Sequence, residues 1–371
     1  MTAFLRLRLT LSVLLMLLLG GCASTDSIRG QLSFELRPEG ARPEVVWPAA
    51  PEVARYRYLG ELVGQPNFTH DSTSDDKLVA AFNWLVGLFE DSTQLLLKLP
   101  QQGTIGDSGR IYVADSGRNA VLVFDPNPPA QDSAKSGEGQ LLEWRFATER
   151  VAFASPVAVA LAWNGELAVS DSILGVVARL NPKGEPVGLL ALDALKRPTG
   201  LAFAPERGWL FVADAAAHDI KVFDGNGQLV NTIGTAGEAD GQFNAPTHLS
   251  YTDGLLYVSD TLNSRIQIFD VEGRRVGGFG ERGLFVGNLA RPKGVAVGAE
   301  GITYVVESYF GRLLAFNRQK ELLLDISGSG LPDGAFRLPA GVWTDKQGRI
   351  YVADMFNSRV VIYQLIGSSG G

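Results

Sequence analysis

Acidic residues end six similar short segments of the chain. Five of the segments end in aspartate and the sixth in glutamate; the acids are Asp115, Asp171, Asp214, Asp260, Glu307 and Asp354. Carboxylates brought together in this way could bind a metal or act as general acids and bases. Each acid, however, precedes a turn, where a carboxylate accepts backbone N–H bonds and can pair with a following arginine. Because an active site should occur once and break a repeat, we interpret the acids as turn-stabilising residues.

The three histidines are the other candidate metal ligands. His248 stands where equivalent segments carry glycine (Gly200, Gly294 and Gly341). His70, His218 and His248 together could bind zinc, but no two of them are close in sequence. We therefore predict no metal and no other cofactor, and expect His248 to line a central channel as a polar side chain.

Four cations fall at or beside the start of equivalent segments: Arg197, Arg291, Lys293 and Arg337. They could form a basic ring that suits an anionic ligand or a carboxylate-bearing partner; ordinary loop charge is the alternative. Within the repeats there is no Gly-X-Ser-X-Gly nucleophile motif, and the sequence has no phosphate-binding loop. We predict no catalytic residue.

The only cysteine follows an N-terminal apolar segment. Residues 1–21 carry Arg6 and Arg8 and then an apolar run over residues 9–19, which is typical of a signal peptide and short for a membrane span. The sequence Leu19-Gly20-Gly21-Cys22 resembles the bacterial lipobox, which implies a covalent lipid on Cys22; an ordinary signal peptide is the alternative. By the same resemblance, Ala23 after the cysteine implies the outer membrane, on its periplasmic side or at the cell surface.

Residues 22–54 contain Pro38, Pro43, Pro48 and Pro51 and show no apolar period, so we expect a spacer between lipid and domain. Residues 73–91 place apolar side chains at helical spacing after a capping box of Thr73 and Asp76, which predicts a helical insert. Residues 367–371 form a short tail.

The repeated segments determine the expected fold. Successive acids are 43 to 56 residues apart, the length of a four-stranded propeller blade. In one repeat we predict strands over residues 246–251, 255–260, 265–270 and 276–280. Six repeats predict an all-β, six-bladed β-propeller over residues 55–366. The last repeat lacks an outer strand, which residues 55–63 could supply and so close the ring.

These repeats also resemble a known family. The stretches Gly241 to Pro246, Leu256 to Thr261 and Asn263 to Asp270 closely resemble the NHL repeat, and Asp333 to Pro339 repeats its first motif. The resemblance covers roughly residues 95–366. It implies a propeller that most commonly binds proteins.

The leading functional hypothesis is a membrane-anchored, protein-binding or scaffold propeller of the bacterial cell envelope. The net charge of −7 and pI near 5.2 argue against nucleic acid as a partner. The alternatives are a metal-dependent hydrolase or lyase of the six-bladed class and an envelope sensor for a small anionic ligand.

Overall fold

The computed structural model describes residues 28–36, 44–69, 94–128, 138–190, 193–326 and 335–366. Cys22, His70, the signal segment 1–21, the predicted helical insert 73–91 and the tail lie outside these residues. Among the described residues, no helix has the length and apolar character needed to cross a bilayer.

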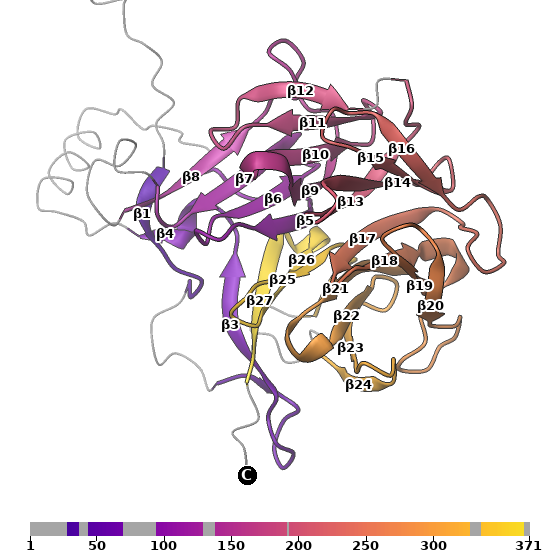
Figure 1. The fold of residues 1–371 in the computed structure, drawn as a ribbon. Coiled ribbons are helices and arrows are strands. Elements are labelled where there is room, and N and C mark those ends of the chain that lie inside the picture. Colours follow the sequence, from indigo (N-terminus) through magenta and orange to yellow (C-terminus); the bar gives the residue numbers. More distant parts are fainter. Residues whose placement is uncertain are drawn as a thin grey trace, which may run out of the picture.

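The protein is a six-bladed β-propeller, as predicted (Figure 1). Blades 2 and 3 each have four antiparallel strands in chain order from the axis outward: β9 (Pro156–Leu161), β10 (Leu167–Asp171), β11 (Val176–Leu180), β12 (Pro186–Leu190); β13 (Pro198–Ala204), β14 (Trp209–Asp214), β15 (Asp219–Phe223), β16 (Leu229–Ile233). Blades 4 and 5 repeat this order: β17 (Pro246–Thr252), β18 (Leu255–Asp260), β19 (Arg265–Asp270), β20 (Arg275–Phe279); β21 (Pro292–Val297), β22 (Thr303–Glu307), β23 (Arg312–Phe316), β24 (Leu322–Asp325).

The first and last blades take up strands from the N-terminal part of the chain. Blade 1 consists of β5 (Pro100–Ile105), β6 (Ile111–Asp115), β7 (Ala120–Asp125), β8 (Gly139–Trp144), β1 (Ile28–Leu32) and β4 (Phe68–Thr69). Blade 6 consists of β25 (Val342–Thr344), β26 (Arg349–Asp354), β27 (Arg359–Leu365), β3 (Tyr56–Leu62) and β2 (Val46–Trp47). Helical structure in the described residues is limited to single 3₁₀ turns: η1 (Gln65–Asn67), η2 (Trp163–Gly165), η3 (Thr261–Asn263), η4 (Ala299–Gly301) and η5 (Met355–Asn357).

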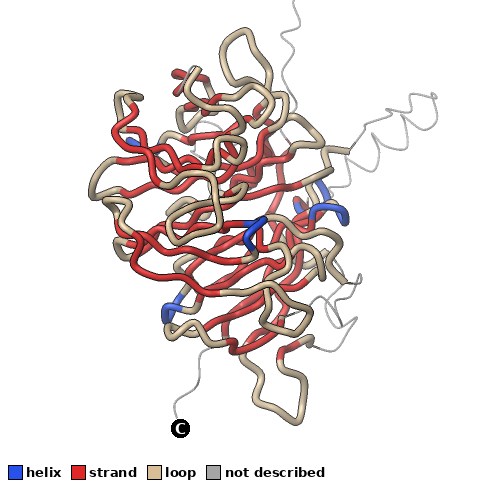
Figure 2. The backbone as a smooth tube through the Cα atoms, turned by 90° about the vertical axis from the view of Figure 1, so that its right-hand side faces the viewer, coloured by secondary structure: helices blue, strands red, loops and turns tan. Residues whose placement is uncertain are grey.

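The core lies between the blades. The second strands of all six blades are almost entirely buried, and β6, β10 and β22 are buried at every residue. Each sheet packs on two neighbours, so both faces of its inner strands are apolar, which removes the alternation expected of a half-exposed strand. The tube in Figure 2 shows the strands gathered in the body of the molecule and the loops at its edges.

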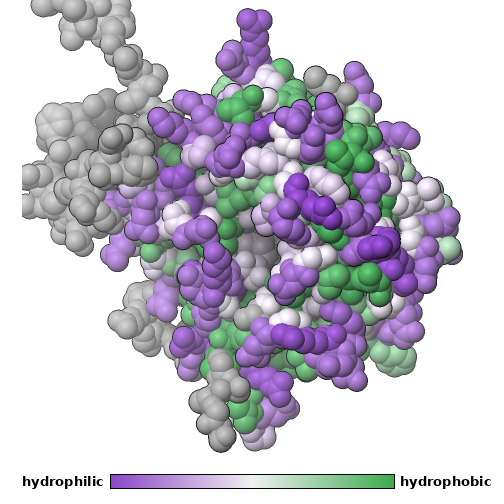
Figure 3. All heavy atoms as spheres, viewed as in Figure 1, coloured by the Kyte–Doolittle hydropathy of each residue, from purple (hydrophilic) through white to green (hydrophobic). Residues whose placement is uncertain are grey.

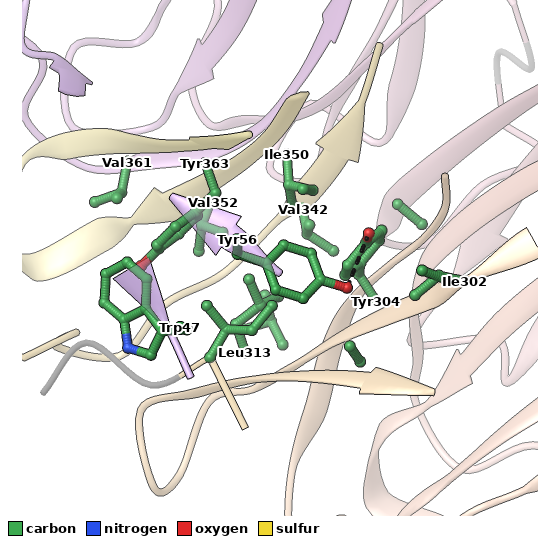
Figure 4. Packing of buried hydrophobic residues seen from close by; sticks show 14 of the residues in the cluster. Trp47, Tyr56, Ile302, Tyr304, Leu313, Val342, Ile350, Val352, Val361 and Tyr363 are labelled. Atoms are coloured by element: carbon green, nitrogen blue, oxygen red, sulfur yellow. Dashed lines mark hydrogen bonds between the residues drawn. The ribbon is translucent and has the colours of Figure 1, made fainter. Parts of the chain in front are cut away.

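Residues 55–63 close the ring, as predicted. β3 pairs antiparallel with β27, with Leu62 opposite Val360 and Tyr56 opposite Leu365. Figure 4 shows Tyr56 reaching Tyr304 of blade 5, where the two hydroxyls are 3.4 Å apart. The two extremities of the propeller therefore share one sheet, which leaves no open seam between blades.

The spacer interpretation of residues 22–54 is wrong for two short segments. β1 pairs with β8 of blade 1, and β2 pairs with β3 of blade 6. Their apolar side chains explain the difference, because Ile28 and Leu32 pack against the blade 1 core and Trp47 is buried. Since Ile28 is only six residues after Cys22, that length of chain spans at most about 22 Å.

Glycines at the axis allow the innermost strands to approach closely. A Cβ atom added to Gly200 would lie 2.7 Å from the Cα of His248, and one added to Gly294 would lie 2.5 Å from the backbone nitrogen of Val342. These contacts join successive blades. The glycine positions of the repeat are therefore packing positions next to the axis.

Candidate functional site

The six repeated acids bind backbone. The Asp115 carboxylate accepts four N–H bonds. Two come from Lys98 and Leu99 before the innermost strand, and two come from Gly117 and Arg118 in the turn after the second strand. Asp171, Asp214 and Glu307 bind the same two regions of their own blades. Burial raises the pKa of Asp115 and these N–H groups oppose the rise. The turn-stabilising interpretation is confirmed for these four acids.

Asp260 and Asp354 use side chains as well as backbone. Each accepts one backbone N–H from the innermost strand's entry, from Asn244 or Arg337. Each also pairs with the arginine five residues later, at 2.8 Å for Arg265 and 2.9 Å for Arg359. The arginine pairing predicted from the sequence is therefore present in blades 4 and 6.

The acids define one face of the propeller, which we call the mouth face. It consists of the turns between the second and third strands and of the loops that lead into the innermost strands. The acids join these two sets of residues in every blade, so both lie at one end of the channel. The opposite face carries the remaining turns.

The predicted cations lie at this mouth. Arg197, Arg291 and Arg337 are exposed and Lys293 is half-buried. Sequence reasoning missed Lys98 and Lys196, which are exposed at the same place. Like Arg337, each of them stands two residues before a proline at the entry of an innermost strand. Within the described residues, no ion pair involves the side chains of Lys98, Lys196, Arg197, Arg291, Lys293 or Arg337.

His248 is buried on the innermost strand of blade 4, with 4% of its surface exposed. Its Nδ1 is 3.1 Å from the hydroxyl of Thr247, which is 2.6 Å from the hydroxyl of Thr261, and Thr261 donates to the carbonyl of Pro292 in blade 5. Because a hydroxyl has one proton, all three bonds form together only if Nδ1 carries the imidazole proton. Nε2 is then an acceptor, and no donor among the described residues reaches it.

The histidines do not form a described metal site. Nδ1 of His218 accepts the backbone N–H of Ala245 at 3.1 Å, which places this side chain in a turn between blades. Among the described residues, no group of three or more histidine, cysteine, aspartate or glutamate side chains is arranged to hold a metal ion. His70 lies outside those residues.

Burial, with a smaller contribution from repulsion by Lys293, lowers the pKa of His248 from 6.5 to about 3. Below pH 6.5 the unfolded chain therefore binds a proton at His248 that the folded protein does not bind. The free energy of unfolding consequently decreases as the pH falls from 6.5 toward 3. We expect the free energy of unfolding, measured by urea denaturation, to fall between pH 6.5 and 5 by about 1–2 kcal/mol more in the natural protein than in His248→Gln. If the free energy of unfolding of the two proteins varied with pH in parallel, a neutral His248 in the folded protein would be contradicted.

Comparison with known proteins identifies the architecture. No family model and no curated protein matches the chain. Among solved structures, a streptogramin B lyase matches with 14% identity over 73% of this chain and 94% of its own, at a TM-score of 0.52. A gluconolactonase from Xanthomonas campestris matches with 15% identity over 89% and 99%, at 0.54. A Bacteroides thetaiotaomicron protein of unknown function matches with 14% identity over 73% and 70%, at 0.55. These likenesses show the fold.

Proposed function

We propose that this chain is a lipid-anchored binding propeller of the bacterial envelope, which docks a protein partner on its mouth face. The observation that carries the proposal is the distribution of exposed large apolar side chains. Twelve of them lie on the mouth face: Leu96, Phe146, Val151, Ile173, Leu262, Leu284, Phe285, Val286, Tyr309, Phe310, Leu338 and Phe356.

The other described faces differ from the mouth face. On the opposite face, Val53 is the one such side chain among the described residues, and the remaining six lie on the outer strands. Exposed apolar residues gathered on one surface are typical of an interaction site, whereas scattered ones are not. On the side shown in Figure 3, apolar side chains (green) form patches among hydrophilic ones (purple).

The charge of the mouth face specifies the partner further. The exposed cations Lys98, Lys196, Arg197, Arg291 and Arg337 surround the channel entrance. Complementary potential steers association and excludes like-charged surfaces. The partner that fits is a protein with acidic side chains around an apolar patch.

The proposed anchor agrees with docking at the membrane. Ile28 pairs with Leu141 and Gly30 with Gly139, so β1 runs antiparallel to β8 and its N-terminal end points toward the mouth face. The lipid on Cys22 would be attached within about 22 Å of this end. Stable anchoring needs two or more acyl chains, which a bacterial lipoprotein would provide. An envelope protein that lies at the same membrane is therefore within reach of the mouth face.

Site-specific crosslinking in intact cells tests the proposal. We expect a photoreactive residue at Ile173 or Tyr309 to give one discrete protein adduct, and the same residue at Lys183 or Asn226 on the opposite face to give none. The double change Arg291→Glu and Arg337→Glu should reduce the adduct at least about ten-fold, because two cations become anions. Equal adducts from both faces, adducts with lipid alone, or indifference to charge reversal would refute the proposed docking.

Anchoring is tested separately. Mass spectrometry of the mature N-terminus should find an acylated Cys22, and Cys22→Ala should abolish the acylation. A mature protein that starts at another residue would contradict the lipid anchor.

A metal-dependent hydrolase or lyase is the second candidate, because two structurally similar proteins bear the names of a lyase and a lactonase. Its test is metal analysis of the purified protein. Stoichiometric zinc or calcium that is lost in His248→Ala would favour this alternative over a binding module.

A further inference from the structure

A cavity of about 370 Å³ that opens widely to solvent lies at the outer seam between blades 4 and 5. Its lining includes Phe279, Glu281, Asn288, Phe316, Lys320 and Leu322. Cavities of this size accommodate small organic ligands. Neither the repeat nor the proposed docking on the mouth face explains it.

One part of the lining is apolar. Phe279 of blade 4 and Phe316 of blade 5 have ring centroids 4.9 Å apart with a tilt of 54° between the rings. Leu322, the first residue of β24, keeps 37% of its surface exposed next to them. Aromatic and aliphatic surface of this kind binds the apolar body of a ligand and releases the water that covers it.

Lys320 supplies a cation in the same cavity. Its Nζ donates to the hydroxyl of Thr303 at 3.0 Å and lies 4.8 Å from the ring centre of Tyr257. Burial lowers its pKa. An ammonium group has three donors, and no carboxylate among the described residues pairs with this one. The remaining donors suit the carboxylate of a ligand.

Glu281 supplies an anion. One oxygen of its exposed carboxylate accepts from the side-chain amide of Asn288 at 3.2 Å. Within the described part of the chain it forms no ion pair, and it is not bridged to Lys320 although both line the cavity. The lining therefore carries one positive and one negative group, each open to a ligand, together with an apolar surface.

We propose that this cavity binds a free α-amino acid with an aromatic or branched aliphatic side chain. Lys320 receives its carboxylate, Glu281 receives its ammonium group, and the apolar side chain rests on Phe279 and Leu322. The opposite charges on the lining fit a zwitterion better than a simple acid or amine, because each of those leaves one charged group of the cavity without a partner. Glu281 and Asn288 lie in the loop before β21 that also carries Leu284, Phe285 and Val286, so this site adjoins the proposed docking surface at its outer edge.

Titration calorimetry of the purified full chain in detergent tests the site with three compounds that share one skeleton. L-phenylalanine carries both charges, 3-phenylpropanoate lacks the ammonium group, and 2-phenylethylamine lacks the carboxylate. We expect phenylalanine to bind most tightly and each analogue to bind about ten-fold or more weakly, since each loses one charge-assisted contact.

Two variants assign the contacts. Lys320→Met should weaken the binding of phenylalanine at least about ten-fold, whereas the matched change Lys183→Met on the exposed surface should leave the affinity for phenylalanine unchanged. Glu281→Gln should remove most of the preference for phenylalanine over 3-phenylpropanoate, and because Glu281 is exposed this variant keeps the fold. No binding of any of the three compounds at millimolar concentration, equal affinities for all three, or an equal loss in Lys183→Met would overturn the proposal.

Discussion

Replacing Arg359 with alanine lowers the free energy of unfolding by about 3–5 kcal/mol, the range seen when one partner of a buried ion pair is removed. The Arg359 side chain is 4% exposed and lies 2.9 Å from Asp354 and 3.1 Å from Glu61. Glu61 comes from the N-terminal strand β3 and Arg359 from the C-terminal strand β27. The substitution leaves two carboxylates poorly compensated at the point where the ring closes.

Urea denaturation measures this effect, with Arg274→Ala as the control. Arg274 also pairs with an aspartate at 2.7 Å, but its side chain is 78% exposed. Exposed pairs contribute at most about 1 kcal/mol. A loss in Arg359→Ala no larger than in Arg274→Ala would mean that the closing ion pair does not stabilise the ring.

The second large effect is expected for Asp115→Ala, which should lower the free energy of unfolding by about 4–6 kcal/mol. Asp115 is fully buried and accepts four backbone N–H bonds. Each buried donor left without an acceptor costs about 1–3 kcal/mol, partly recovered where water enters the turn. Asp115→Asn, which keeps one acceptor oxygen, should lose about half as much.

Asp224→Ala is the matched control for this measurement. Asp224 also accepts two backbone N–H bonds, but these lie in an exposed turn where water can replace the carboxylate. Asp224→Ala should therefore lower the free energy of unfolding by no more than about 1 kcal/mol. If the free energy of unfolding fell by similar amounts in Asp115→Ala and Asp224→Ala, burial would not strengthen the contribution of Asp115. That result would contradict the structural role proposed for the repeated acids.

Together these two predictions separate architecture from function. The repeated acids and the arginines that pair with them hold turns and blades together, so their loss should unfold the protein. The residues proposed to bind the partner protein are different in kind, because they are exposed and contribute little to folding. Variants at Tyr309 or Glu281 should therefore change binding while the unfolding curve stays the same.

The repeat in the sequence determined the fold and most of the strand positions. Its period, its paired apolar strands and its terminal acids depend on local pattern, and the predicted strands 255–260 and 265–270 match β18 and β19. Ring closure by residues 55–63 was predictable because a blade with one strand missing exposes an edge that another segment must cover. The positions of β1 and β2 were not predictable. A strand of two to five residues is too short to show a period of its own, and it gains its stability from the sheet edge that it joins.

The candidate sites depended on the tertiary structure. The sequence located His248 by its contrast with glycine in equivalent blades, but the proton arrangement on its ring follows from Thr261 and Pro292, which only the packing of blade 5 on blade 4 brings close. The gathering of exposed apolar residues on the mouth face, and the meeting of Lys320 with Glu281 in one cavity, involve residues tens of positions apart or in different blades. A local sequence pattern shows which faces of a single strand are buried. Surfaces and cavities arise where separate blades meet, so only the tertiary structure reveals them.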